Sequence, residues 1–201
     1  MNNKILLHLG WITSTLFILG TIIFALLLQD YSQISQTISE IGEQGSLLRN
    51  EWQLFSIGTS CLLLLFSIGL IRFSVEHKLS IVPCIFLLLF SLSEIAIGFF
   101  PSPHYLHNIF GLSLIIGYFS PLLFALKWRN QLGTSFITFS IYAFIIIISG
   151  VIMNLLPIFV DSSFLIENYG IIQRYLIYSF YTYCAYVSIR SINRIRTKKS
   201  N

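Results

Sequence analysis

The sequence predicts an all-α membrane protein, a polytopic bundle of six transmembrane helices. Of its 201 residues, 55% are hydrophobic and 10% are charged, and the mean hydropathy is +0.80, which excludes an ordinary water-soluble domain. The apolar residues fall into six runs, each near the roughly 20 residues that a helix needs to cross the hydrocarbon layer. These runs are too long and too uniformly apolar for the strands of a membrane barrel.

The first apolar run is expected to stay in the mature protein as a span. It is longer than the apolar region of a usual signal peptide, and no small-residue cleavage site follows it. We therefore predict one transmembrane domain over residues 1–189 and a basic cytoplasmic tail over residues 190–201. The predicted spans are Ile5–Leu28, Gln53–Phe73, Ile81–Phe100, Leu106–Leu126, Ser135–Phe159 and Gly170–Ile189.

The basic residues indicate the orientation. With six spans, all of the 12 Lys and Arg residues except Arg49 and Arg174 fall on the side of the two termini. Because cytoplasmic loops are enriched in Lys and Arg, we predict that both termini are cytoplasmic. The net charge of +4 does not gather in a patch with interleaved aromatic residues, so no nucleic-acid partner is expected.

The long connection after the first span is expected to contain a short amphipathic helix on the outer face. Glycine tolerates the backbone conformation that ends a helix, so this helix should stop at Gly42 or Gly45. A polar loop with scattered isoleucines is the alternative. The apolar residues near helical spacing are Ile34, Ile38, Ile41 and Leu48.

Glu94 is the residue around which we predict a site. It lies about seven residues before Pro101, which at 1.5 Å per residue is roughly 10 Å below the outer end of its helix. A charge at that depth costs on the order of 2.5–3.5 kcal/mol, so Glu94 should face the bundle interior and have either a partner or a proton. We expect an ion pair with Arg174 in the sixth span, and His107 is the second candidate.

The sixth span carries a polar stripe that should face inward. Arg174, Tyr178, Tyr181, Ala185 and Ser188 recur at helical spacing. Hydroxyl groups on this stripe are expected either to line a cavity or to bond to neighbouring helices. Ser39 beside Glu40 is a possible nucleophile if His107 serves as its base.

Evidence for a cofactor is weak. His104 and His107 are three residues apart and, with Glu94, are candidates for a metal site, although ordinary polar capping is the preferred interpretation. Three cysteines lie in apolar runs without the spacing of a metal or redox motif, so they are expected to pack in the core. We predict no cofactor and no metal, and no nucleophile or phosphate-binding motif is visible.

Four short motifs lie at corresponding places along the chain: Ser39-Glu40-Ile41-Gly42, Gly98-Phe99-Phe100-Pro101, His107 and Gln173-Arg174. Together they resemble a bacterial family of six-span membrane proteins known as domain of unknown function 998. The resemblance extends over nearly the whole chain and implies a six-helix fold in a bacterial cytoplasmic (inner) membrane, with a polar cluster facing outward and no established activity. Ser39, Glu40, Pro101, His107 and Arg174 match the family pattern, and His104 and Glu94 match it less closely.

These observations predict a polar pocket in the outer leaflet that binds or transports a lipid-like or amphipathic small molecule. Membrane lipid is the expected partner, and an anionic head group would suit Arg174 and His107. The alternatives are a membrane-embedded metal-dependent lipid hydrolase and a structural protein whose buried charges lock helices together. The oligomeric state is left open. The predicted pocket residues are Ser39, Glu40, Glu94, His107, Arg174 and Tyr178.

Overall fold

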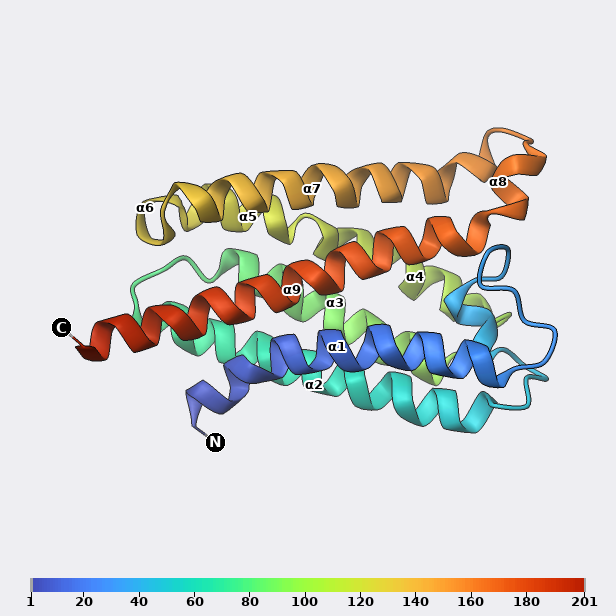
Figure 1. The fold of residues 1–201 in the computed structure, drawn as a ribbon, viewed down its shortest axis with the longest axis horizontal. Helices are drawn as coiled ribbons and strands as arrows, with labels where there is room; N and C mark the ends of the chain where they lie inside the picture. Colours follow the sequence, from blue (N-terminus) through green and yellow to red (C-terminus); the bar gives the residue numbers. More distant parts are fainter. Residues whose placement is uncertain (1, 201) are drawn as a thin grey trace.

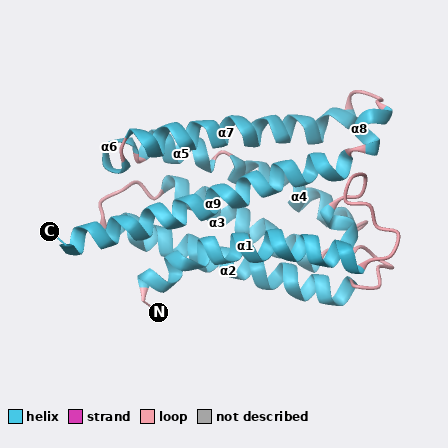
Figure 2. Ribbon diagram, viewed as in Figure 1, coloured by secondary structure: helices cyan, strands magenta, loops and turns pink. Residues whose placement is uncertain are grey.

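A computed structural model describes residues 2–200, with side chains described for residues 2–129 and 131–195, and this part of the chain is helical without a β-strand (Figures 1 and 2). Helices α1, α2, α3, α7 and α9 and the pair α4–α5 run side by side along the bundle. The elements are α1 (Asn3–Leu27), η1 (Ile38–Gly42), α2 (Arg49–Glu76), α3 (Val82–Phe99), α4 (Tyr105–Tyr118), α5 (Ser120–Lys127), α6 (Arg129–Leu132), α7 (Thr134–Leu155), η2 (Leu156–Ile158), α8 (Ser163–Glu167) and α9 (Tyr169–Ser200).

Five segments are long and apolar enough to cross a membrane, judged by length and composition, and they coincide with the first five predicted spans. The sixth predicted span lies within α9, which is not among the five. Its tyrosines, Gln173 and Arg174 lower its hydropathy. The five segments are Asn3–Leu27, Arg49–Glu76, Val82–Phe99, Tyr105–Lys127 and Thr134–Ile158.

The two ends of the bundle differ in character. Both ends of the chain lie at one end of the bundle, together with the connections around residues 77–81 and 128–133 (Figure 1). The long connection at 28–48, the turn at 100–104 and α8 lie at the other end, which we call the loop end. Helix α9 continues through the predicted tail to Ser200; the side chains of Arg196, Lys198 and Lys199 in that tail lie outside the described residues.

The long connection at the loop end differs from the prediction. In place of an amphipathic helix on the outer surface, it forms the short 3-10 helix η1, whose Ile38 and Ile41 are buried in the bundle. Thr37 and Glu40 explain the tight start of η1, because the Glu40 carboxylate accepts hydrogen bonds from the Thr37 backbone N–H (2.9 Å) and hydroxyl (2.8 Å). The helix ends at Gly42, one of the two predicted positions.

The fourth predicted span is broken into α4 and α5 at Phe119. Pro121 has no N–H to donate to the carbonyl of Gly117, and this loss favours a change of direction there. Helix α5 packs beside α7, whereas α4 packs mainly on α3 and has only slight contact with α7. The break therefore leaves α4 and α7 separated near the loop end.

Hydroxyl side chains are accommodated in the apolar core by bonding to backbone carbonyls. Ser67, Ser74 and Ser91 each donate to the carbonyl four residues earlier, at 2.7–2.9 Å, which satisfies a buried polar group without a partner helix. Ser188 instead donates to the carbonyl of Leu7 at 2.6 Å and so ties α9 to α1.

Close packing of α1 on α2 depends on Gly69. A methyl group added there would lie 2.6 Å from Cβ of Leu6 and 3.2 Å from its backbone carbonyl carbon. We expect Gly69→Ala to lower the free energy of unfolding in detergent by about 1–3 kcal/mol, because the two helices must move apart. Chemical denaturation followed by circular dichroism measures this change.

Gly58 in the same helix supplies the control, since nothing lies within 4 Å of a methyl group added there. Gly58→Ala should leave stability unchanged or raise it slightly, because alanine favours helix. Equal destabilisation by both changes would contradict the close approach at Gly69.

Candidate functional site

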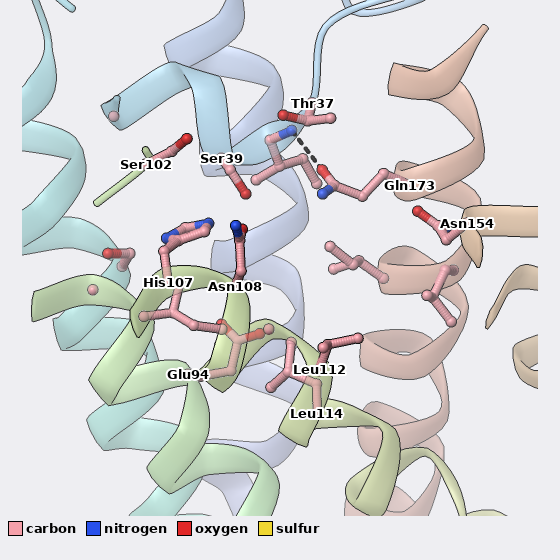
Figure 3. Close-up of a pocket in the computed structure, with 18 of the residues that line it drawn as sticks. Thr37, Ser39, Glu94, Ser102, His107, Asn108, Leu112, Leu114, Asn154 and Gln173 are labelled. Carbon is pink, nitrogen blue, oxygen red and sulfur yellow. Dashed lines mark hydrogen bonds between the residues drawn. The ribbon is translucent and has the colours of Figure 1, made fainter. Parts of the chain in front are cut away.

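A cavity of about 610 Å³ lies inside the loop end of the bundle. Residues from α2, α3, α4, α7 and α9 form its walls, and Figure 3 shows the side chains that face it. The segment 31–44, which includes η1, closes it from the loop end and is called the roof. Thr37, Ile38, Ser39 and Gly42 are the roof residues in contact with the cavity.

Aromatic residues close the cavity at the opposite side. Phe17 and Tyr118 line it there, and behind them Phe90, Phe180 and Tyr181 are fully buried. Phe17 stacks on Tyr181 with ring centroids 4.2 Å apart, and Phe90 lies 4.2 Å from Phe180. This packed aromatic layer closes the cavity on the side away from the roof, so the cavity is a pocket and not a continuous channel.

Glu94 lies in the cavity wall without a protein partner. Its side chain projects from α3 and is 8% exposed. Among the described residues, no group donates a hydrogen bond to its carboxylate, and no basic side chain forms an ion pair with it. A carboxylate in an apolar setting is costly to leave unpaired, so Glu94 either holds a proton or pairs with a group that enters the cavity.

His107 presents a free ring nitrogen to the same space. Its Nδ1 lies 2.8 Å from the carbonyl oxygen of Phe100. A carbonyl can only accept, so Nδ1 carries the proton, and in the neutral ring Nε2 is left as an acceptor. Figure 3 shows Ser39 of the roof and His107 and Asn108 of α4 facing one another across the cavity, with Glu94 below them.

Arg174 holds the roof and does not reach Glu94. Its guanidinium, 6% exposed, donates through Nη1 to the carbonyls of Gln33 (2.9 Å), Gln36 (2.7 Å) and Gly170 (3.0 Å). Through Nη2 it donates to the hydroxyl of Tyr31 at 2.6 Å. The predicted Glu94–Arg174 ion pair is therefore wrong, because roof carbonyls satisfy this cation.

Tyr31 extends the same network. Burial raises the pKa of Tyr31 above its ordinary value, and the nearby Arg174 guanidinium opposes part of that rise. The phenol therefore keeps its proton near neutral pH and donates it to the carbonyl of Thr37 at 2.6 Å. Arg174, Tyr31 and the roof backbone thus form one chain of hydrogen bonds.

The first turn of α9 is shaped to receive the roof. A methyl group at Gly170 would lie 2.3 Å from the carbonyl oxygen of Gln36, so glycine is needed where the two backbones meet. The backbone N–H of Ile171 donates to the carbonyl oxygen of Ile34 at 3.0 Å. The backbone N–H of Ile38 donates to Oε1 of Gln173 at 2.7 Å, as Figure 3 shows. These contacts and the Arg174 bonds are together called the roof clamp.

Part of the cavity wall is exposed on the outside of the bundle. Leu112 of α4 and Ile158 of η2 both line the cavity, and they are 57% and 70% exposed. Leu112 and Ile158 are therefore places where the cavity wall also reaches the surface of the bundle, and we call this pair of side chains the apolar rim.

The sequence matches, over residues 11–190, the family described as protein of unknown function (DUF998). The chain belongs to the DUF998 family. No curated protein and no solved structure matches it. The predicted resemblance is thereby confirmed, and it covers the whole site of this DUF998 protein.

The structure of this DUF998 protein separates the six predicted pocket residues into two groups. Ser39, Glu94 and His107 line the cavity. Glu40 is turned back to cap η1, and Arg174 belongs to the roof clamp. Tyr178 shares a hydrogen bond with Thr21 at 2.7 Å, so this part of the polar stripe of α9 joins α1 and does not line the cavity.

The candidate metal ligands are not brought together. Nδ1 of His104 accepts from the backbone N–H of Leu106 at 3.1 Å and so caps α4, the ordinary role that was preferred. Within the described part of the DUF998 chain, no three His, Cys, Asp or Glu side chains gather in a position to hold a metal ion.

Three cavity residues were missed by sequence reasoning about a site. Gln53, Asn108 and Gln173 all line the cavity. Gln53 donates from Nε2 to the carbonyl of Gly98 at 2.9 Å, and Gln173 holds the roof. The sequence does show these three amide side chains at the outer ends of three predicted spans. Amides are costly to expose to lipid at such positions, but the sequence does not indicate that the three line one cavity.

Removing the Arg174 guanidinium should loosen the roof of the DUF998 protein. In Arg174→Met we expect amide hydrogen exchange in residues 33–38 to accelerate at least about tenfold, because hydrogen bonds to a charged group contribute roughly 1.5–3 kcal/mol. Gly170→Ala should have the same effect through steric clash. Exchange measured by mass spectrometry in lipid nanodiscs tests both.

Arg72→Met is the matched control, since Arg72 is exposed on α2 at the opposite end of the bundle. It should leave exchange in the roof unchanged. If Arg174→Met and Arg72→Met gave the same exchange rates over residues 33–38, the roof clamp would not depend on the guanidinium.

Proposed function

We propose that this DUF998 protein binds or transports a lipid-like or amphipathic small molecule in the cavity beneath the roof. The observation that carries the proposal is the cavity's division into two chemical zones. Polar groups from Ser39, Glu94, His107 and Asn108 gather on one side. Leucine and isoleucine side chains, among them Leu112, Leu114 and Ile115, form another part of the wall, and such a surface suits an apolar tail. Amide groups of Gln53, Asn154 and Gln173 complete the lining.

Entry of the ligand from the membrane at the apolar rim fits the exposure of Leu112 and Ile158. An amphiphile partitioned into the bilayer already has its tail at the depth of the apolar rim formed by Leu112 and Ile158. Moving through that rim keeps the tail in apolar surroundings while its head group reaches the polar side. This route avoids the cost of transferring a long apolar chain through water.

The proposed setting is a bacterial inner membrane crossed six times, with both termini cytoplasmic. Helix α9 lies beside α1 and α7 along the bundle (Figure 1), which supports a sixth crossing despite its lower hydropathy. The excess of Lys and Arg on the side of the termini supports this orientation. The roof and cavity would then lie in the outer leaflet.

Direct binding of dodecyl compounds tests the proposal. The probes are dodecylamine, dodecanol and dodecanoic acid, added to delipidated protein in detergent and followed by native mass spectrometry. We expect at least one probe to give a one-to-one adduct with the unmodified protein. An absence of adducts with all three probes would overturn the proposal.

Gly111→Phe should block the cavity and abolish that adduct. Gly111 lines the cavity and nothing lies within 4 Å of a methyl group added there, so a side chain can start at this position without a clash at its Cβ atom. Gly58→Phe is the matched control, because Gly58 is equally unobstructed but lies outside the cavity lining. Adducts of equal strength in the two variants would place binding elsewhere.

A further inference from the structure

The Glu94 carboxylate sets the charge that a ligand of this cavity has to complement. It is more than nine-tenths buried, lines the cavity, and receives no hydrogen bond from the described residues. Leaving a buried anion without a donor is strongly unfavourable, and a cation within hydrogen-bond distance offsets that cost. A ligand with a cationic group therefore gains binding energy by pairing with the Glu94 carboxylate, which the fold holds in the cavity wall.

No Lys or Arg is among the described residues that line the cavity. Arg174, the basic residue predicted to pair with Glu94, instead donates from its Nη1 and Nη2 atoms to the roof and to α9. An anionic head group would therefore meet the Glu94 carboxylate without a basic side chain to balance it. The charges of the wall favour a positive head group over a negative one.

The other polar groups on this side of the cavity supply acceptors. His107 offers Nε2 when its ring is neutral, because Nδ1 is used on Phe100. Asn108 and Ser39 bring an amide oxygen and a hydroxyl oxygen toward the same space (Figure 3). A primary ammonium group has three N–H donors, and this arrangement offers one charged and several neutral acceptors around it.

We infer that the cavity selects amphiphiles with a protonated amine head group, which pairs with Glu94 and donates to His107 and its neighbours. The inference rests on the proposed function and specifies the ligand class of the same site. The apolar tail occupies the side lined by Leu112, Leu114 and Ile115 and reaches the bilayer through the apolar rim.

The test compares dodecylamine, dodecanol and dodecanoic acid at pH 7, where an alkylamine is protonated. The three probes share one tail and differ in the head group. For the unmodified protein we expect dodecylamine to bind at least about tenfold more tightly than dodecanol, as expected for a charge-assisted hydrogen bond. Dodecanoic acid should bind more weakly than dodecanol.

Glu94→Gln should remove the preference and retain the pocket. Glutamine keeps the shape of glutamate but not its charge, so the ratio of amine to alcohol affinity should fall to about one while dodecanol still binds. Glu51→Gln is the matched control, since Glu51 is exposed on α2 and lies outside the cavity lining. It should keep the preference of the unmodified protein.

The outcomes separate the two claims. Equal binding of dodecylamine and dodecanol to the unmodified protein would overturn the head-group inference and leave the proposed function standing. This comparison needs no variant, so it holds even if Glu94→Gln fails to fold. Tighter binding of dodecanoic acid than of dodecylamine would also overturn the inference, whereas failure of every probe to bind would overturn the proposed function itself.

Discussion

The buried guanidinium of Arg174 is the interaction on which the loop end of this protein depends. Carbonyl groups of the roof have no helical partner of their own, and in a buried position each needs a donor. A planar cation with several N–H groups meets two of these carbonyls, the carbonyl of Gly170 in α9 and the Tyr31 hydroxyl at once. Gly170 completes the fit by letting the roof backbone touch the first turn of α9.

This use of Arg174 determines the chemistry of the cavity. Because the guanidinium donates to the roof and to α9, the Glu94 carboxyl group remains without a protein partner in the cavity wall. Had the two side chains paired, the cavity would be lined by an ion pair with little demand for a ligand. Their separation leaves a structural cation in the loop end and an unpaired carboxyl group in the pocket.

Sequence reasoning could predict which residues are unusual but not which of them meet. The depth of Glu94 and Arg174 in apolar runs showed that both must be buried, and both are. Opposite charges at similar depth suggested a pair. The carbonyls of Gln33 and Gln36 competed successfully for the guanidinium, and sequence gives no sign of where an irregular backbone segment will place its acceptors. Glu40 was likewise predicted to line the pocket, but its carboxylate accepts hydrogen bonds from Thr37 at the start of η1.

The sequence by itself determined the all-helical fold, the approximate positions of five membrane-length segments and the burial of Glu94 and Arg174. These follow from the cost of exposing backbone and charge to hydrocarbon, which depends on local composition. Tertiary structure decided the packing of the roof on α9, the exposure of cavity-wall residues in α4 and η2, and the division of the polar residues between clamp and cavity. Each of these features depends on contacts between segments far apart in the chain, such as residues 33–38 with residues 170–174. Local hydrophobic periodicity does not predict such contacts, because it reflects only neighbouring residues.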